Sequence, residues 1–318
     1  MKIFKYCVKY ERRNKKYNLV GGKMIRGLTT VSSYETLKRP EKVTEESLQL
    51  VSIMGWCTEM LQAYLTMLDD IIDDSKTRRG KPSWYRRKDV GLRAVNDSTL
   101  MYSVMFETLQ TFFGNHTNYD MIVKLFNETV FHTAIGQYCD TSTTLLKDYN
   151  LFTMELYNTI ATYKSAYYSV HLPICLAMYL ANITDKQIVQ KTEDISSDMG
   201  ILFHISLQDD YIDCFGDESE TGKLGTDIQN GKCTWLAVTA LERCTPRQRL
   251  VFDTCYGSSQ PAHVERIKQL YKELKLPEAY SQYEQRQFEM VMQKSKQIPE
   301  LSSELFTNLI TVIHKRRR

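Results

Sequence analysis

Glycine and proline are scarce in this chain: 14 glycines and 7 prolines occur in 318 residues. Folds built from many short strands need frequent turns rich in these residues, so their scarcity argues against a β-sandwich or barrel and favours helices. The eight cysteines include no Cys-x-x-Cys pair, which argues against a zinc site or a disulfide framework and favours a reducing, cytoplasmic compartment. The net charge of +3 is too small to indicate nucleic acid as a partner.

Long apolar runs are also missing. The longest apolar stretch, residues 170–183, includes His171 and Pro173 and is shorter than the roughly 20 residues that a membrane-spanning helix needs. We therefore expect no stable membrane insertion. The N-terminus is basic, and Lys5 and Lys9 interrupt any apolar run there, so it does not form a secretory signal. A cleaved organelle leader and an ordinary basic helix start both stay open for this segment.

Apolar residues recur at steps of three and four through most of the chain, which predicts helices that bury one face. The segments with this pattern are 52–74, 104–113, 119–131, 151–180 and 198–215. No linker rich in Pro, Gly or Ser and no clear internal repeat divides them. We therefore predict a single all-α domain over residues 1–318 with about ten helices. Residues 1–16 form a basic N-terminal extension or a shortened first helix in this prediction.

Two clusters of aspartates each follow an apolar helical run. Their members are Asp69, Asp70 and Asp73 in the first cluster and Asp209, Asp210 and Asp213 in the second. Residues four apart lie on one face of a helix, so each cluster brings like charges together and is repulsive unless a cation lies between them. Carboxylate oxygens without a nearby His or Cys suit Mg²⁺. A solvated helix end explains a single cluster equally well, but two copies favour a metal site.

Basic residues accompany both clusters. They are Lys23 and Arg26 near the N-terminus, Arg78 and Arg79 after the first cluster, Lys164 in a central helix, and Lys223 and Lys232 after the second cluster. Each of them alone is most simply a solvated charge. Together they indicate a site for two multiply charged anions, bridged by metal on one side and clamped by Arg and Lys on the other.

Five segments carry a resemblance to a known family. They are GGKMIRG, LQAYLTMLDDIIDDSKTRRGKPSWY, GQYCD, YKSAYYS and QDDYIDCFGDESETGKLGTDIQNGKCTW, in this order. The chain resembles the trans-isoprenyl diphosphate synthases from about Tyr17 to Arg318, and most closely the farnesyl diphosphate synthases of animals. The resemblance implies an all-α isoprenoid-synthase bundle around a central apolar cavity. It also implies a homodimer.

The resemblance further implies roles for individual residues. A cluster of three Mg²⁺ ions would be bound by Asp69, Asp70, Asp73 and Asp209, with support from Asp210 and Asp213. The diphosphate of an allylic substrate would be neutralised by Arg78, Lys164 and Lys223, with Gln137, Asp140, Asp227 and Lys232 nearby. The second substrate, isopentenyl diphosphate, would be held by Lys23, Arg26, Gln62 and Arg79. The catalytic set is then Asp69, Asp70, Asp73, Asp209, Lys164 and Arg78.

The sequence departs from the family pattern at three places near the expected substrates. Ile205-Ser206 replaces a Phe-Gln pair, and Ser165 replaces a Thr but keeps a hydroxyl. Tyr64-Leu65 replaces two Phe that form the floor of the chain-length pocket in the animal enzymes. Loss of the Gln and a reshaped floor favour a terpene synthase, which ionises farnesyl or geranylgeranyl diphosphate without a second substrate.

Two alternatives stay open. The chain is a prenyltransferase that condenses an allylic diphosphate with isopentenyl diphosphate if the changes at Ile205 and Ser206 are neutral, and the intact Lys23 and Arg26 support this reading. A non-catalytic regulatory subunit is the other alternative, and the complete set of aspartates and basic residues argues against it. The terpene synthase is the leading expectation from the sequence.

Overall fold

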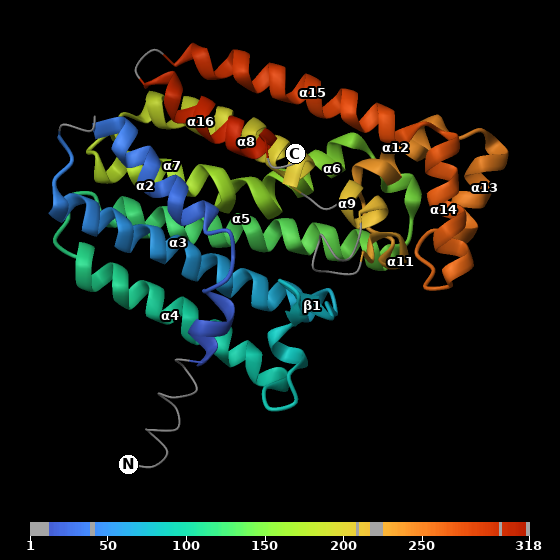
Figure 1. The fold of residues 1–318 in the computed structure, drawn as a ribbon, viewed down its shortest axis with the longest axis horizontal. Helices are drawn as coiled ribbons and strands as arrows, with labels where there is room; N and C mark the ends of the chain where they lie inside the picture. The colour runs from blue at the N-terminus through green and yellow to red at the C-terminus, as the bar shows by residue number, and fades with distance from the viewer. Residues whose placement is uncertain (1–12, 39–41, 208–209, 217–224, 299–300, 316–318) are drawn as a thin grey trace. The chain divides into compact units, whose positions relative to one another are not determined.

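The computed structural model describes residues 13–38, 42–207, 210–216, 225–298 and 301–315. Helices make up most of this part of the chain, and its strands are limited to a two-residue pair, β1 (Thr77–Arg78) and β2 (Lys81–Pro82) (Figure 1). The predicted all-α class is therefore confirmed. The helices group into two compact units. Unit 1 comprises Met1–Glu128 and Leu172–Asp185, and unit 2 comprises Thr129–His171 and Lys186–Arg318. The organisation as a single domain stays a prediction.

Unit 1 contains the helix that ends at the first aspartate cluster and helices that precede and follow it in the sequence. They are α2 (Ile25–Lys38), α3 (Glu45–Ile72), η2 (Trp84–Arg86), η3 (Gly91–Arg93), α4 (Ala94–Phe113), the start of α5 (Tyr119–Leu146) and α7 (Leu172–Leu180). The side chain of Thr44 accepts from the backbone of Ser47 in a capping box that starts α3. Two glycines bring α2 against α3: a Cβ at Gly27 or at Gly55 would lie 2.9 Å from the carbonyl oxygen of the other residue. The two backbones therefore meet directly, and this contact fixes where α2 begins.

Unit 2 contains the rest of α5 and most of the C-terminal helices. They are η4 (Tyr149–Leu151), α6 (Met154–Ile160), the π-helix η5 (Ala161–His171), α8 (Lys186–Leu207), α9 (Asp210–Phe215), α11 (Asp227–Asn230), α12 (Trp235–Arg243), α13 (Pro246–Cys255), α14 (Pro261–Glu273), α15 (Leu276–Lys294), η6 (Ser295–Gln297) and α16 (Ser303–Lys315).

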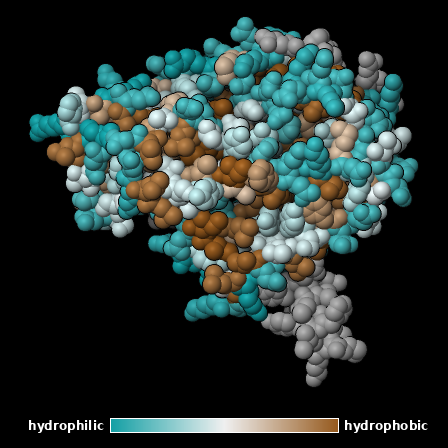
Figure 2. Space-filling model, turned by 180° about the vertical axis from the view of Figure 1, so that it is seen from behind, coloured by the Kyte–Doolittle hydropathy of each residue, from teal (hydrophilic) through white to brown (hydrophobic). Residues whose placement is uncertain are grey.

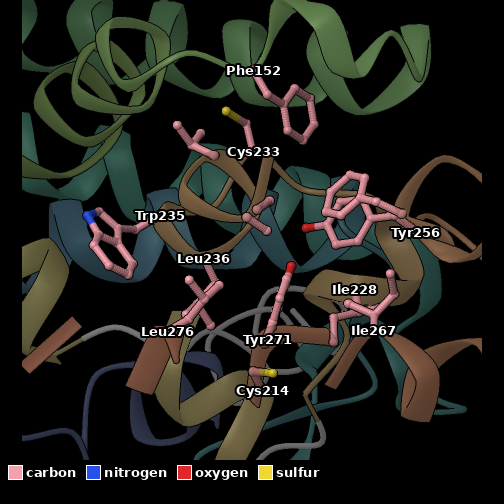
Figure 3. Packing of buried hydrophobic residues seen from close by; sticks show 14 of the residues in the cluster. Phe152, Cys214, Ile228, Cys233, Trp235, Leu236, Tyr256, Ile267, Tyr271 and Leu276 are labelled. Carbon is pink, nitrogen blue, oxygen red and sulfur yellow. The ribbon is translucent and has the colours of Figure 1, made fainter. Parts of the chain in front are cut away.

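An aromatic core holds these elements together. Tyr256 stacks on Phe252 with 4.5 Å between ring centroids, and Phe252 meets the ring of Tyr149 edge-on at 5.4 Å. In Figure 3 the hydroxyl groups of Tyr256 and Tyr271 point toward one another at the centre of this core. Ile228 of α11 and Cys233, which follows Lys232, belong to the same core.

The π-helix η5 is eleven residues long and interrupts what the sequence pattern predicts as one helix over 151–180. Two glycines let neighbouring helices approach it closely. A Cβ at Gly136 of α5 would lie 2.2 Å from the backbone nitrogen of Lys164, and a Cβ at Gly200 of α8 would lie 2.0 Å from the Cβ of Ala166. The π-helix is therefore packed between α5 and α8. π-helical turns are rare and often occur at functional sites.

Apolar side chains reach the surface in patches between hydrophilic ones on the face that Figure 2 shows. One regular series lies on α5, where the residues Phe131, Tyr138 and Leu145 are 63%, 73% and 76% exposed. They are spaced seven residues apart, which places them along one stripe of the helix. None of the helices in the described ranges has the length and apolar character that crossing a membrane requires.

Candidate active site

The first aspartate cluster lies at the C-terminal end of α3. Asp73 caps this helix, and its backbone N–H donates to the carbonyl of Asp69 at 2.8 Å. Both side chains therefore lie within the last turn, where the helix dipole already presents partial negative charge. Carboxylates at this position are electrostatically unfavourable by themselves, so the cluster is suited to attract cations.

Arg78 of β1 offsets part of this charge. Its Nε and Nη2 donate to Oδ1 of Asp70 at 2.9 and 2.6 Å, and Nη2 also donates to Oδ2 of Asp69 at 3.3 Å. Asp70 is only 3% exposed, and burial raises the pKa of its carboxyl although the charge of Arg78 acts in the opposite direction. Asp70 therefore forms an internal ion pair, whereas Asp69 and Asp73 are only partly buried.

Arg79 projects from a backbone with a positive φ of 55°. Its Nη1 donates to the carbonyl oxygen of Asn18 at 3.1 Å, and a Cβ at Gly22 would lie 2.6 Å from its Nη2. Burial lowers the pKa of Arg79, and so do the positive charges of Arg78 and Arg26, while Glu59 acts in the opposite direction. The N-terminal segment therefore holds this guanidinium within a cluster of three arginines.

Glu59 ties the start of α2 to this cluster. It is 4% exposed, and its Oε1 accepts from the backbone N–H of Gly27 at 2.8 Å. Together with the contact between Gly27 and Gly55, this bond fixes the neighbouring Arg26. On the same helix, Gln62 donates to Thr66 at 2.8 Å, and its buried Oε1 has no hydrogen-bond partner among the described residues.

A small cavity opens beside these groups in unit 1. The residues that line it include Tyr17, Met67, Asp70, Arg78, Arg79 and Lys81. The cavity thus lies between the N-terminal segment, α3 and the β1–β2 pair. Its wall combines an apolar part with guanidinium and ammonium groups, which suits a small anion with an apolar portion.

The predicted pocket-floor residues lie elsewhere on α3. The ring of Tyr64 is 5.0 Å from the ring of Tyr102 on α4, and Tyr102 in turn meets Phe106 at 4.9 Å. Burial raises the pKa of Tyr64. Leu65 is half-buried. Tyr64 is therefore part of an aromatic series inside unit 1.

In unit 2, Asp140 joins two lysines that lie far apart in the sequence. Its Oδ2 accepts from Nζ of Lys164 and from Nζ of Lys232, each at 2.7 Å. Burial alone would raise the pKa of Asp140, but the charges and hydrogen bonds of both lysines hold this pKa well below its usual range. Gly136 lies one turn earlier on α5, so its close contact with Lys164 is what allows this triad to form.

Two further predicted side chains lie near this triad in the sequence. Oγ of Ser165 and Nδ1 of His204 are 3.2 Å apart in a buried hydrogen bond, and the His204 ring is 5.5 Å from that of Tyr157. Gln137 has a buried Nε2 with no hydrogen-bond partner in the described part of the chain. The π-helix therefore directs Lys164 toward α5 and Ser165 toward α8.

The second aspartate cluster is described only in part. Asp213 of α9 accepts from the backbone N–H of Thr226 at 3.1 Å and from that of Asp227 at 2.8 Å. Asp209 and Lys223 lie outside the described residues, and so do the side chains of Ser206 and Asp210.

Two of the residues that shape the site have no counterpart in the sequence prediction. Glu59 positions the start of α2, and the carbonyl of Asn18 accepts from Arg79. A Glu within the largely apolar run from Met54 to Leu61 was a usable signal, because a buried carboxylate needs a partner. A backbone carbonyl gives no such signal.

The acidic side chains fit Mg²⁺ by their chemistry. The first cluster offers Asp69 and Asp73 as oxygen donors, and Mg²⁺ is usually bound through one or two carboxylates together with substrate phosphates. No group of three or more His, Cys, Asp or Glu that could hold a metal ion occurs among the residues described, which do not include Asp209. The first cluster alone is thus a partial set of ligands.

Comparisons with known proteins assign the chain to a family. A family model described as Polyprenyl synthetase matches residues 9–274, so the chain belongs to this family of all-α isoprenoid synthases. Its relatives include a "Farnesyl pyrophosphate synthase" of Murgantia histrionica, 41% identical over 303 residues that cover 95% of this chain and 74% of the relative. A protein of the same name from Gallus gallus is 40% identical, and the match covers 95% of this chain and 83% of the relative. Another, from Saccharomyces cerevisiae, is 37% identical, and the match covers 95% of this chain and 87% of the relative.

The comparisons confirm the resemblance to the trans-isoprenyl diphosphate synthases and show that the chain is an enzyme of the trans-prenyltransferase family. Prenyltransferases of this family generally use Mg²⁺. The leading expectation of a terpene synthase is not supported, because each of the relatives named above is called a farnesyl pyrophosphate synthase. The comparisons favour the alternative, a condensing prenyltransferase.

Proposed function

We propose that this protein condenses an allylic prenyl diphosphate with isopentenyl diphosphate and releases a longer prenyl diphosphate, farnesyl or geranylgeranyl diphosphate. The observation that carries the proposal is the arrangement around the contact between α2 and α3. Arg26, Arg78 and Arg79 form one cationic cluster there, and α3 also carries the buried Gln62. The family resemblance assigns Arg26, Gln62 and Arg79 to the second substrate, and a terpene synthase has no need of that second site.

The cationic cluster of unit 1 would bind isopentenyl diphosphate. Lys23 is exposed two residues before α2 begins, and Arg26 lies in the first turn of this helix. The guanidinium of Arg79 is held by Asn18, so it is oriented before the ligand arrives. Preorganised donors of this kind bind a diphosphate with little loss of side-chain entropy.

The lysine pair of unit 2 would bind the allylic diphosphate. Asp140 fixes the two ammonium groups, and the charge on the departing diphosphate grows as the C–O bond breaks. Lys164 and Lys232 would stabilise that charge, and Lys223 would contribute to the same site. Bound Mg²⁺ supplies Lewis-acid stabilisation of the diphosphate oxygens. Asp69, Asp73 and Asp209 would hold it, and three ions remain the expected number.

One sequence feature favours a terpene synthase as the second candidate. Ile205-Ser206 removes the Gln that the family resemblance places near the reacting carbons. If this position decides the reaction, Ser206→Gln increases condensation relative to hydrocarbon formation. If the protein is a condensing prenyltransferase, Ser206→Gln leaves the type of product unchanged.

Incubation with Mg²⁺ and different substrates separates the two candidates. A condensing enzyme forms a longer diphosphate only when geranyl diphosphate and isopentenyl diphosphate are both present. Such an enzyme forms no volatile hydrocarbon when farnesyl or geranylgeranyl diphosphate is supplied alone. A terpene hydrocarbon in the headspace of the single-substrate reaction contradicts the proposal.

We also propose a homodimer, located in the cytoplasm. The stripe of Phe131, Tyr138 and Leu145 along α5 supports self-association, because exposed apolar residues at heptad spacing favour helix pairing. Sedimentation of the purified protein tests this: a monomer at micromolar concentration contradicts the dimer.

A further inference from the structure

The carboxylate of Asp213 accepts hydrogen bonds from the protein backbone. Oδ2 accepts from the N–H of Thr226 and Oδ1 accepts from the N–H of Asp227, so each oxygen has a main-chain donor. The backbone of this segment also approaches closely: a Cβ at Gly225 would lie 1.9 Å from the carbonyl oxygen of Asp213. Residues 225–227 are therefore packed against the end of α9.

The segment that Asp213 holds leads directly to Lys232. The helix α11 starts at Asp227 and ends before Gly231, which has a left-handed φ of 69°. After this turn, the N–H of Lys232 donates a hydrogen bond to the carbonyl oxygen of Asp227 at 3.0 Å. On the far side, the hydroxyl of Tyr256 donates to the carbonyl of Lys232 at 2.6 Å. The backbone of Lys232 is thus fixed from both ends.

We infer that Asp213 is a positioning residue, which fixes Lys232 and through it the triad with Asp140 and Lys164, and not a direct Mg²⁺ ligand. The inference rests on the proposed function, because it takes Lys164 and Lys232 as the pair that binds the allylic diphosphate. A carboxylate that turned toward a cation would give up bonds to two backbone amides. Those amides start α11, so their loss displaces the helix that leads to Lys232.

Hydrogen exchange without metal or substrate is the primary test. In the Mg²⁺-free protein, Asp213→Ala should speed exchange in a peptide covering 225–232 by at least about tenfold, the factor expected when a bond to a charged acceptor is lost. Asp213→Asn should restore much of the protection, because its one carbonyl oxygen still accepts from a backbone amide. Asp73→Ala is the matched control and should leave this peptide unchanged.

Steady-state kinetics give the second readout. Asp213→Ala should raise KM for the allylic diphosphate severalfold and leave both KM for isopentenyl diphosphate and the half-saturating Mg²⁺ concentration unchanged. The inference is overturned if exchange over 225–232 is the same in Asp213→Ala and the unsubstituted protein while the Mg²⁺ requirement rises as it does in Asp73→Ala. Hydrogen exchange is measured without turnover, so it tests the role of Asp213 even if the unsubstituted protein does not condense the two substrates. Failure to condense them would reject the proposed function separately.

Discussion

Replacing Asp140 with Asn removes a negative charge that two largely buried ammonium groups share. Lys164 and Lys232 each donate to Oδ2 at 2.7 Å, and their side chains are 22% and 11% exposed. Hydrogen bonds to a charged group contribute about 1.5–3 kcal/mol each, and breaking a buried ion pair costs about 3–5 kcal/mol. We therefore expect Asp140→Asn to lower the free energy of unfolding by about 3–5 kcal/mol at neutral pH.

The stabilisation that Asp140 provides depends on pH, because only the ionised carboxylate pairs with the two lysines. The folded state holds the pKa of Asp140 below its usual range, so the stabilisation is fully present above the ordinary carboxyl pKa of about 4 and is lost as pH falls below it. Urea unfolding monitored by circular dichroism at several pH values is the assay. The gap between the unsubstituted protein and Asp140→Asn should be constant near neutrality and narrow on acidification.

A surface carboxylate provides the control. Asp253 pairs with Arg249 four residues earlier on α13, and its side chain is 43% exposed. Asp253→Asn should cost only about 0.3–0.5 kcal/mol, as exposed helix pairs do. If Asp140→Asn costs no more than this control, or if its effect does not change with pH, the reasoning about the triad is refuted.

Three substitutions in unit 1 test the other parts of the site. Asp69→Ala should reduce kcat by several orders of magnitude through loss of a metal-binding carboxylate, and turnover near the unsubstituted level would reject Asp69 as a ligand. Arg79→Ala should raise KM for isopentenyl diphosphate about 10- to 100-fold and spare KM for the allylic diphosphate, whereas equal rises would contradict its assignment. Gly55→Ala should destabilise unit 1 by about 1 kcal/mol, because the clash with the carbonyl of Gly27 outweighs the gain in helix propensity. A thermal midpoint at or above that of the unsubstituted protein would show that the two helices separate without cost.

The sequence pattern predicts the helical class and the position of the first cluster well, because these depend on local periodicity. The segment 52–74 is predicted as a helix, and α3 covers Glu45–Ile72, so Asp73 lies at its end as the clustering of charge suggests. The family motifs also predict which lysines and arginines bind the substrates, and that assignment stays a prediction. These features are encoded within a few turns of the chain.

Long-range contacts determine what the pattern does not predict. The π-helix over Ala161–His171 has the same apolar residues as an α-helix, and close backbone contacts with Gly136 and Gly200 accompany it from elsewhere in the chain. Asp213 has the spacing of a third metal ligand, yet it accepts from amides thirteen and fourteen residues away. No local signal distinguishes these two roles of a carboxylate.

Transfer of labelled carbon from isopentenyl diphosphate tests the central claim most directly. The protein is incubated with Mg²⁺, unlabelled geranyl diphosphate and isopentenyl diphosphate labelled at its five carbons, and the diphosphate products are analysed by mass spectrometry. We predict a farnesyl or geranylgeranyl diphosphate in which every added C5 unit is labelled. Unlabelled hydrocarbon formed from the geranyl diphosphate, with no label in any longer diphosphate, would contradict the account.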